Sequence, residues 1–354
     1  MTFVLGDESG SDDRPVGRLG RYRALDGSEG APVGLDLDGP HAALVVGKRG
    51  YGKSYTLGVI AEELARARGV APVVVDPMGA FETLTAAADG AAVPATVVER
   101  PTVDPAALDP RSWCDLLGLS PESGAGSLVW RAARTAATLD GMAATVTDAD
   151  APTADRRAAR NHLDLAASWG VFGSDGLDAT DLAGPGATVL DVSGLDAAPL
   201  NAVVRAVGDA LYRARVDGSV ERFPWLLVDE AHTVAEGVAW PALRRILTRG
   251  RAPGVSLVLA TQRPSALPTV AVSQSDLLVA HRLTSTADLD ALAAARPTYL
   301  DGTLDDRLPA DPGTAVVVDD ASESVHTVRI RGRATPHGGD SPSAREAAAA
   351  VDDR

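Results

Sequence analysis

The sequence has 354 residues, 45% of them hydrophobic, and a net charge of −15 at pH 7. That apolar content is enough for a sizeable core in one large or two small domains. The single cysteine, Cys114, excludes an intrachain disulfide framework and a Cys-x-x-Cys metal site. No signal-peptide pattern and no run of about 18 apolar residues occurs, so we expect a cytoplasmic protein that does not enter a membrane.

The negative charge comes with very few lysines. The chain has 48 aspartates and glutamates but only two lysines among its 33 basic residues, and aromatic residues make up 4%. This composition is typical of proteins adapted to a salty cytoplasm, and we hypothesise a halophilic origin. An acidic surface would then serve solvation in general, so the net charge does not exclude DNA as a partner.

The first 38 residues are predicted to form a short N-terminal segment and not a domain. They are rich in glycine, aspartate and arginine and contain two short apolar pieces, at 16–19 and 33–37. A tail or a small strand pair fits this pattern, because the segment is too short to bury a core of its own.

A glycine-rich turn joins an apolar run at 43–46 to a helical pattern. The run predicts a buried strand, and Leu57, Ile60 and Leu64 recur at helical spacing after the turn. The turn matches the pattern Gly-x4-Gly-Lys-Ser, in which backbone N–H groups wrap phosphate oxygens at the start of a helix. We therefore predict a nucleotide site at Gly47, Lys48, Arg49, Gly50, Tyr51, Gly52, Lys53, Ser54 and Tyr55.

Two side chains of this turn have distinct expected roles. Lys53 would contact the β- and γ-phosphates, and the Ser54 hydroxyl would bind Mg²⁺. One of the two lysines thus occupies the position that needs a compact ammonium, for which the planar fork of arginine is no substitute. This placement argues against an accidental glycine-rich turn.

The chain after this helix continues the pattern of an α/β sheet. An apolar run at 71–76 ends in an Asp-Pro-Met-Gly turn, and strand, helix, strand is the beginning of a parallel sheet. From about 101 to 182 the sequence changes to alanine-rich stretches broken by aspartate, proline and glycine, which predicts a helical insertion. The arginine run at 155–160 is either a phosphate-contacting surface or, more commonly, a solvated helix face.

The sheet pattern resumes at 187–192, and a further strand at 225–228 follows an amphipathic helix. This last strand ends in Asp-Glu-Ala-His, at the edge where a sheet of this type binds phosphates. Asp229 would hold Mg²⁺, and Glu230 would orient and partly deprotonate an attacking water. The alternative is a strand-end pair that caps the next helix.

An apolar strand at 255–260 ends in Thr-Gln, which predicts Gln262 as a sensor near the γ-phosphate. In the loop before this strand, Arg251 and, as a reserve, Arg249 are candidates for a finger that acts on a neighbour's γ-phosphate. Solvated turn chemistry is the alternative for both arginines. Weaker strands and a disordered tail are predicted at 277–280, 314–318, 325–330 and 333–354.

Three stretches together resemble the HerA/FtsK family of DNA-pumping ATPases, the HerA branch most closely. They are the phosphate-binding turn, the Asp-Glu-Ala-His quartet at 229–232, and 251–265, whose Arg-Ala-Pro-Gly-Val leads to Thr-Gln-Arg-Pro-Ser and, further on, to Val-Ser-Gln at 272–274. The third stretch is far more specific than a phosphate-binding turn. The resemblance covers about residues 33 to 330. A turn at 76–81 also looks like the family's, although members often have an acidic residue where Ala80 stands.

The resemblance implies fold, cofactors and partners. It implies a RecA-like P-loop NTPase domain over 39–332, with a mainly parallel sheet flanked by helices and the helical insertion within it. It also implies ATP and Mg²⁺ as cofactors, a homo-oligomer, expected to be a hexamer, and DNA, with duplex the favoured form. A NurA-like nuclease is a further implied partner. Family members usually carry a β-barrel ahead of the turn, where fewer than fifty residues stand here, and this departure weakens that last expectation.

Other functional classes remain as alternatives. A GTPase would need Asn-Lys-x-Asp, and both lysines are already placed at 48 and 53, so ATP is the favoured nucleotide. A nucleotide-gated binding or scaffold protein would keep Lys53 and lack turnover stimulated by DNA. A kinase is disfavoured, because Glu230 and Gln262 suit water as the nucleophile, and no Gly-x-Ser-x-Gly element favours a serine hydrolase.

Overall fold

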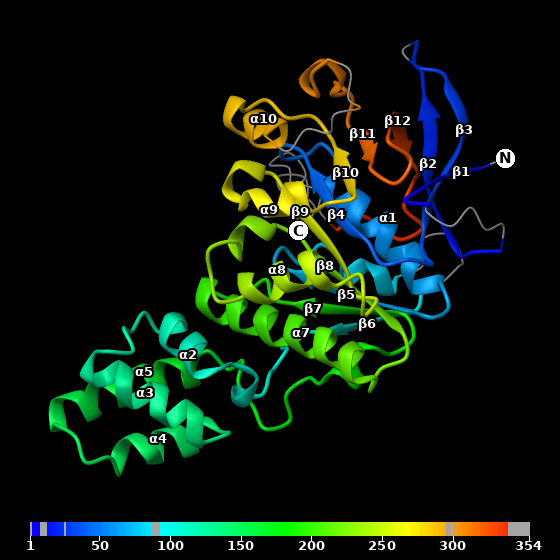
Figure 1. The fold of residues 1–354 in the computed structure, drawn as a ribbon. Coiled ribbons are helices and arrows are strands. Elements are labelled where there is room, and N and C mark those ends of the chain that lie inside the picture. The colour runs from blue at the N-terminus through cyan, green and yellow to red at the C-terminus, as the bar shows by residue number, and fades with distance from the viewer. Residues whose placement is uncertain are drawn as a thin grey trace, which may run out of the picture.

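The computed structural model describes residues 2–7, 13–24, 26–86, 93–294, 299 and 302–338. The strands in this part of the chain form a twelve-stranded sheet in the order β1-β3-β2-β12-β11-β10-β4-β9-β8-β5-β7-β6 (Figure 1). Their bounds are β1 Phe3–Leu5, β2 Val16–Arg23, β3 Glu29–Asp36, β4 Ala42–Val46, β5 Val70–Asp76, β6 Ala95–Val98, β7 Ala187–Asp191, β8 Phe223–Val228, β9 Ser256–Thr261, β10 Leu277–Ala280, β11 Thr314–Asp319 and β12 Ser324–Ile330.

The sheet has a parallel part and an antiparallel extension. All neighbours from β10 through β4, β9, β8, β5 and β7 to β6 are parallel. On the other side of β10, the strands β11, β12, β2 and β3 are added antiparallel, and β1 then pairs parallel with β3. The predicted α/β class with a mainly parallel sheet is confirmed.

Helices cover both faces of the parallel part. The described helices are α1 Lys53–Arg66, α2 Pro110–Leu116, α3 Gly124–Thr135, α4 Leu139–Thr147, α5 Thr153–Ser168, α6 Ala179–Leu182, α7 Ala197–Asp217, α8 Trp240–Arg249, α9 Thr269–Ser273 and α10 Thr286–Ala293. Side chains alternate along each strand, so Leu44 and Val46 join the core under α7 and α8, while Ala43 and Val45 join the core under α1. Strands buried on both faces read as continuous apolar runs, as the sequence does here.

Helices α2 to α5 form a lobe beside α7, away from β1 to β3 (Figure 1). Asp109, Ser123 and Thr138 accept hydrogen bonds from the first turns of α2, α3 and α4 and so define where these helices begin. The lobe is tied to α7 by Arg205, whose buried guanidinium lies 3.1 Å from Asp109 Oδ2. In the arginine run of α5, Arg160 pairs with Asp164 on its own helix at 2.8 Å.

The segment after β12 lies across α1. The fully buried carboxylate of Glu62 accepts hydrogen bonds from the backbone amides of Ala334 and Thr335, both at 3.0 Å, and from the Thr335 hydroxyl. Arg331 adds an ion pair at 2.8 Å. Of the tail predicted at 333–354, residues 333–338 lie against α1, and the remainder falls outside the described residues.

No helix in the described part of the chain has both the length and the apolar character that a membrane crossing requires.

Candidate functional site

The glycine-rich turn lies between the end of β4 and the start of α1, at the carboxyl edge of the parallel strands. Gly50 and Gly52 have φ angles of 80° and 113°, which side chains with a Cβ rarely adopt. Gly52 is the N-cap residue of α1, and no side chain caps the helix there. The first backbone amides of α1 therefore donate no hydrogen bond to a capping side chain. The turn therefore presents the positive end of a helix at this edge, an arrangement that binds anions.

Lys53 and Ser54 begin α1 and face two acidic residues that directly follow β8. Lys53 is buried, and burial lowers the pKa of its ammonium against the opposing charges of Glu230 and Asp229. The Ser54 hydroxyl donates to Asp229 Oδ2 at 2.7 Å. Burial raises the pKa of Asp229 to about 6, with the charge of Glu230 acting in the same direction and the Ser54 hydroxyl against it. An added cation would relieve this cost of burying a carboxylate.

The pair of Ser54 and Asp229 fits a magnesium ion. No group of three or more His, Cys, Asp or Glu side chains suited to a metal occurs in the described ranges. Mg²⁺ bound with a nucleotide needs fewer protein ligands, because phosphate oxygens and water complete its octahedron. A hydroxyl and a carboxylate 2.7 Å apart beside the turn supply the two oxygens that such an ion would take from the chain.

Glu230 follows Asp229 in a left-handed backbone conformation, with φ 46° and ψ 44°. Such a conformation is uncommon for a residue with a long side chain and is often found at functional sites. Burial raises the pKa of the Glu230 carboxyl, but hydrogen bonds from His232 and the Gln262 backbone amide and the charge of Lys53 outweigh burial, so the pKa lies below its usual value. An ionised carboxylate at this position can accept a proton from water.

His232 connects Glu230 to the neighbouring strand, a role that its position in the sequence did not predict. Its Nδ1 atom lies 3.2 Å from Glu230 Oε2 and 3.2 Å from the Thr261 hydroxyl, at the end of β9. Thr261 in turn accepts a hydrogen bond from the amide of Arg263. The only sequence signal was the presence of histidine in the Asp-Glu-Ala-His quartet. Because Thr261 pairs with Val46 in the sheet, Gln262 follows β9 next to the start of the turn.

The side chains of the other predicted residues of the turn lie in different surroundings. Arg49 is exposed, and the Lys48 ammonium lies 4.3 Å from the centre of the Tyr51 ring. The Lys48 amide donates to Arg282 O at 2.7 Å, which fixes the base of the turn. The Tyr55 hydroxyl accepts from the Arg333 amide at 2.7 Å, so this side chain contacts the C-terminal segment, while its backbone stays in the first turn of α1.

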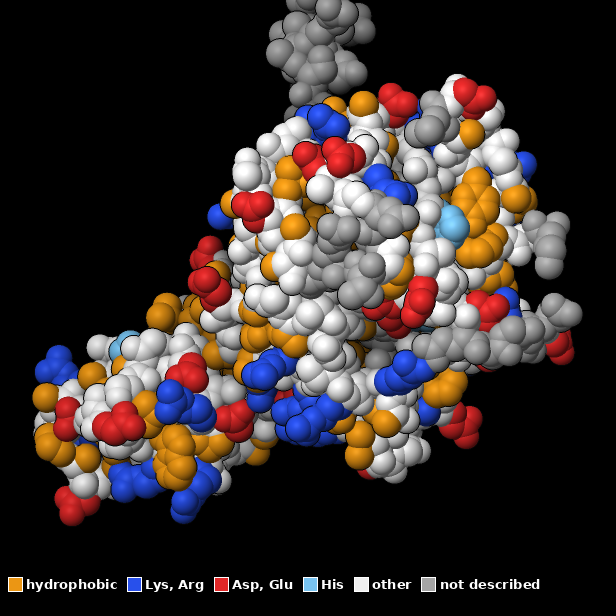
Figure 2. Space-filling model, turned by 45° about the horizontal axis from the view of Figure 1, so that its top comes forward, with side chains coloured by type: hydrophobic (Ala, Val, Ile, Leu, Met, Phe, Trp, Pro, Cys, Tyr) orange, Lys and Arg blue, Asp and Glu red, His pale blue; other side chains and the backbone are white. Residues whose placement is uncertain are grey.

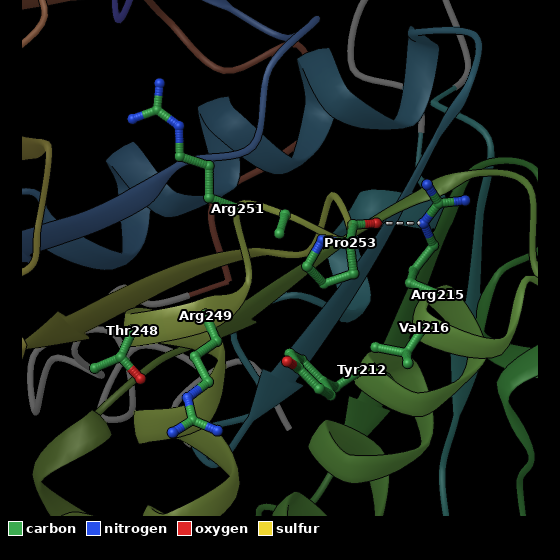
Figure 3. Close-up of a pocket in the computed structure, with 8 residues that line it drawn as sticks. Tyr212, Arg215, Val216, Thr248, Arg249, Arg251 and Pro253 are labelled. Carbon is green, nitrogen blue, oxygen red and sulfur yellow. Dashed lines mark hydrogen bonds between the residues drawn. The ribbon is translucent and has the colours of Figure 1, made fainter.

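The structure places Arg249 and Arg251 at the opposite edge of the sheet. They lie between the end of α8 and the start of β9 and line an open pocket of about 870 Å³ with the end of α7 (Figure 3). The two guanidinium groups point away from each other, and Arg215 holds the loop through Pro253 O at 2.8 Å. The six residues of β9 span about 20 Å, so neither arginine reaches the turn of its own chain.

The fold and the carboxyl edge of the sheet define a P-loop NTPase. They combine a parallel sheet, a Gly-x4-Gly-Lys-Ser turn before a helix, and an acidic pair at the end of another strand. Residues 16–159 match the family model described as the helicase HerA central domain. Over these residues the chain is similar to that domain, and the predicted resemblance to the HerA/FtsK family is confirmed. The matched stretch contains the phosphate-binding turn, but it stops before β8 and β9.

Solved structures show the same fold at low identity. VirB4 of Thermoanaerobacter pseudethanolicus is 16% identical, with a TM-score of 0.65 over 92% of this chain and 98% of that chain. The bacterial conjugative coupling protein TrwB is 15% identical, with a TM-score of 0.59 over 95% of this chain and 97% of that chain. A second TrwB structure, at 16% identity and a TM-score of 0.53, covers 85% of this chain and 87% of that chain and contains the GTP analogue GDPNP. No curated protein matches the sequence significantly.

Proposed function

We propose that this chain is the ATP-hydrolysing subunit of a ring that moves along DNA. In this proposal Lys53 binds the β- and γ-phosphates, Ser54 and Asp229 hold Mg²⁺, Glu230 activates water, and Gln262 senses the γ-phosphate. The observation that carries the proposal is the convergence of the buried lysine, the hydroxyl and the two carboxylates at one edge of the sheet. The backbone amides from Gly47 to Tyr55 complete the phosphate site.

A second subunit is part of the proposed site. Arg251, with Arg249 in reserve, lies about 20 Å from the turn of its own chain, the length of β9, and so would act on the nucleotide of a neighbour. A finger supplied in trans stabilises charge on the transferring phosphate. A closed ring gives every nucleotide site such a neighbour, and a hexamer is the ring that the family resemblance implies.

DNA is proposed as the track because of the family relationship and the uneven surface charge. Although the whole chain is acidic, arginine side chains gather among acidic ones on the helical lobe, and basic side chains also gather where the lobe meets the sheet body (Figure 2). Phosphate contacts of this kind are independent of sequence and weaken steeply with salt. We further propose that residues 39–332 act as one cytoplasmic ATPase domain, with the lobe as its insertion and residues 1–38 as an edge extension.

The decisive measurement is the rate of nucleotide hydrolysis with and without DNA. The protein is assayed in concentrated KCl, with ATP or GTP and Mg²⁺, and with duplex DNA, single-stranded DNA or neither. We expect ATP hydrolysis that duplex DNA stimulates, because a translocating ring couples turnover to the occupancy of its channel. Including GTP is warranted because TrwB has been solved with a GTP analogue. A rate that no DNA changes, at any salt that keeps the protein folded, would favour the scaffold alternative.

A further inference from the structure

His281 lies directly against the phosphate-binding turn, although no motif of the sequence points to it. It follows β10, and its backbone amide donates to Val46 O, at the end of β4, at 2.8 Å. A Cβ atom placed on Gly47 would lie 2.6 Å from His281 Cβ, and one placed on Gly52 would lie 3.3 Å from His281 Cε1. Both glycines that bound the turn are therefore packed on this one fully buried side chain.

Both ring nitrogens of His281 have a hydrogen-bond partner. Nδ1 lies 2.9 Å from the carbonyl oxygen of Thr314, and Nε2 lies 2.9 Å from the hydroxyl of Thr56. A carbonyl oxygen only accepts, so Nδ1 carries the proton and Nε2 accepts from the Thr56 hydroxyl. Burial lowers the pKa of His281 to about 4, and the charge of Lys53 acts in the same direction, so the ring is neutral near pH 7.

These contacts join three elements at the base of the turn. Thr314 begins β11, His281 follows β10, and Thr56 lies in α1, where its amide donates to Gly52 O at 2.8 Å. We propose that His281 is a positioning residue for the phosphate site, because it fixes the start of α1 against the sheet so that the amides of the turn and Lys53 meet the phosphates. The inference rests on the proposed nucleotide site and goes beyond it by assigning a residue that does not contact the nucleotide.

The test compares three substitutions by nucleotide affinity. Thr56→Val removes the donor to His281 and keeps the shape of the side chain, whereas Thr56→Ser keeps the donor. Affinity is measured by titration with a fluorescent ADP analogue and Mg²⁺, and kcat is measured at saturating ATP. We expect Thr56→Val to weaken binding about 5- to 100-fold, since a buried acceptor loses its partner, and Thr56→Ser to keep the wild-type affinity. His281→Leu should weaken binding at least as much, with kcat nearly unchanged.

A second buried histidine supplies the matched control. His41 precedes β4, at the opposite end of the same strand, and pairs with Asp276 at 3.2 Å. We expect His41→Leu to lower the melting temperature and leave nucleotide affinity unchanged. The double variant of Thr56→Val and His281→Leu should bind no more weakly than His281→Leu alone, because both changes remove the same contact.

Each outcome decides the inference. Wild-type affinity in Thr56→Val overturns it, as does an equal loss of affinity in His281→Leu and His41→Leu, which would mark a general effect of destabilisation. If His281→Leu does not fold, the two Thr56 variants decide alone. If the wild-type protein binds no nucleotide, the proposed function is refuted. If the wild-type protein binds nucleotide and the Thr56 and His281 variants bind it equally well, only the role of His281 is refuted.

Discussion

The carboxyl and amino edges of the sheet differ in how many of the groups of a site a single chain brings together there. At the carboxyl edge, Ser54 is hydrogen-bonded to Asp229 and His232 lies 3.2 Å from Glu230, all within a single chain. At the amino edge, α7, α8 and the loop before β9 border an open pocket of about 870 Å³. The groups proposed to bind phosphate and activate water are thus organised within one chain, whereas the proposed role of the arginines at the other edge requires a neighbouring subunit.

The largest expected effect comes from the amino edge. Homogeneous rings of Arg251→Ala should lose about 10³- to 10⁵-fold in turnover, because the finger stabilises charge on the transferring phosphate. Rings of Glu230→Gln should also be inactive. Mixing the two inactive proteins should restore measurable ATP hydrolysis, since some boundaries then join an intact Glu230 to an intact Arg251.

This complementation test needs its own control. Subunit exchange is followed with labelled subunits, and mixed rings of each variant with wild type are assayed in parallel. If subunits exchange and the wild-type mixtures hydrolyse ATP while the mixture of the two variants does not, Arg251 does not act in trans. Arg249→Ala is then examined in the same way.

At the carboxyl edge, two substitutions should separate binding from turnover. Glu230→Gln should bind ATP with near wild-type affinity and lower kcat by about 10²- to 10⁴-fold, because it removes a general base and keeps the shape of the side chain. Lys53→Ala should lose most nucleotide affinity, because the β- and γ-phosphates lose their buried cation. Titration with a labelled nucleotide and single-turnover hydrolysis measure the two quantities. An equal loss of binding in both variants would contradict these roles.

A smaller effect is expected from pH. The folded-state pKa of His281 is about 4, below the usual 6.5, so between these values the unfolded chain binds a proton that the folded chain does not. Stability should therefore be complete above about pH 6.5 and fall as pH drops toward 4, by on the order of 3 kcal/mol. Denaturant unfolding at several pH values measures this slope. Asp229, with a pKa raised to about 6, contributes the opposite slope, so His281→Leu is compared with wild type to isolate the histidine.

The smallest effect should come from a position on neither edge. Arg160 and Asp164 form an exposed ion pair four residues apart on α5. Asp164→Ala should change the free energy of unfolding by only about 0.3–0.5 kcal/mol and leave ATP hydrolysis unchanged. A change in stimulation by DNA when Arg160→Ala is assayed would instead favour the phosphate-contacting reading of this run.

The sequence was most informative where a local pattern carried the structure. The apolar runs predicted β4, β5 and β7 to β11 within a few residues, because strands buried on both faces are largely apolar, and β12 was predicted although it is only partly buried. The strands β6 and β1 were not predicted, since both are short and only partly buried, unlike the equally short but more buried β10.

The site was predictable to a similar extent. A Gly-x4-Gly-Lys-Ser turn between a strand and a helix, with an acidic pair at the end of a later strand, indicates phosphate chemistry. In contrast, His281 contacts Thr56 across 225 positions of the chain, and His232 contacts Thr261 across 29. Such contacts arise from strand order, and a single sequence carries no local signal for them.

The contact of Lys48 with Tyr51 has a practical consequence for chemical labelling. Lys48 and Lys53 are the only two lysines of the chain, and both lie in the phosphate-binding turn. Reagents that modify primary amines can therefore react with this turn and with the amino terminus, and with no other side chain. Lys53 is buried and its pKa is lowered, whereas Lys48 lies against the ring of Tyr51. The two amines therefore differ in environment, and the rate of modification of each one reports separately on its own part of the turn.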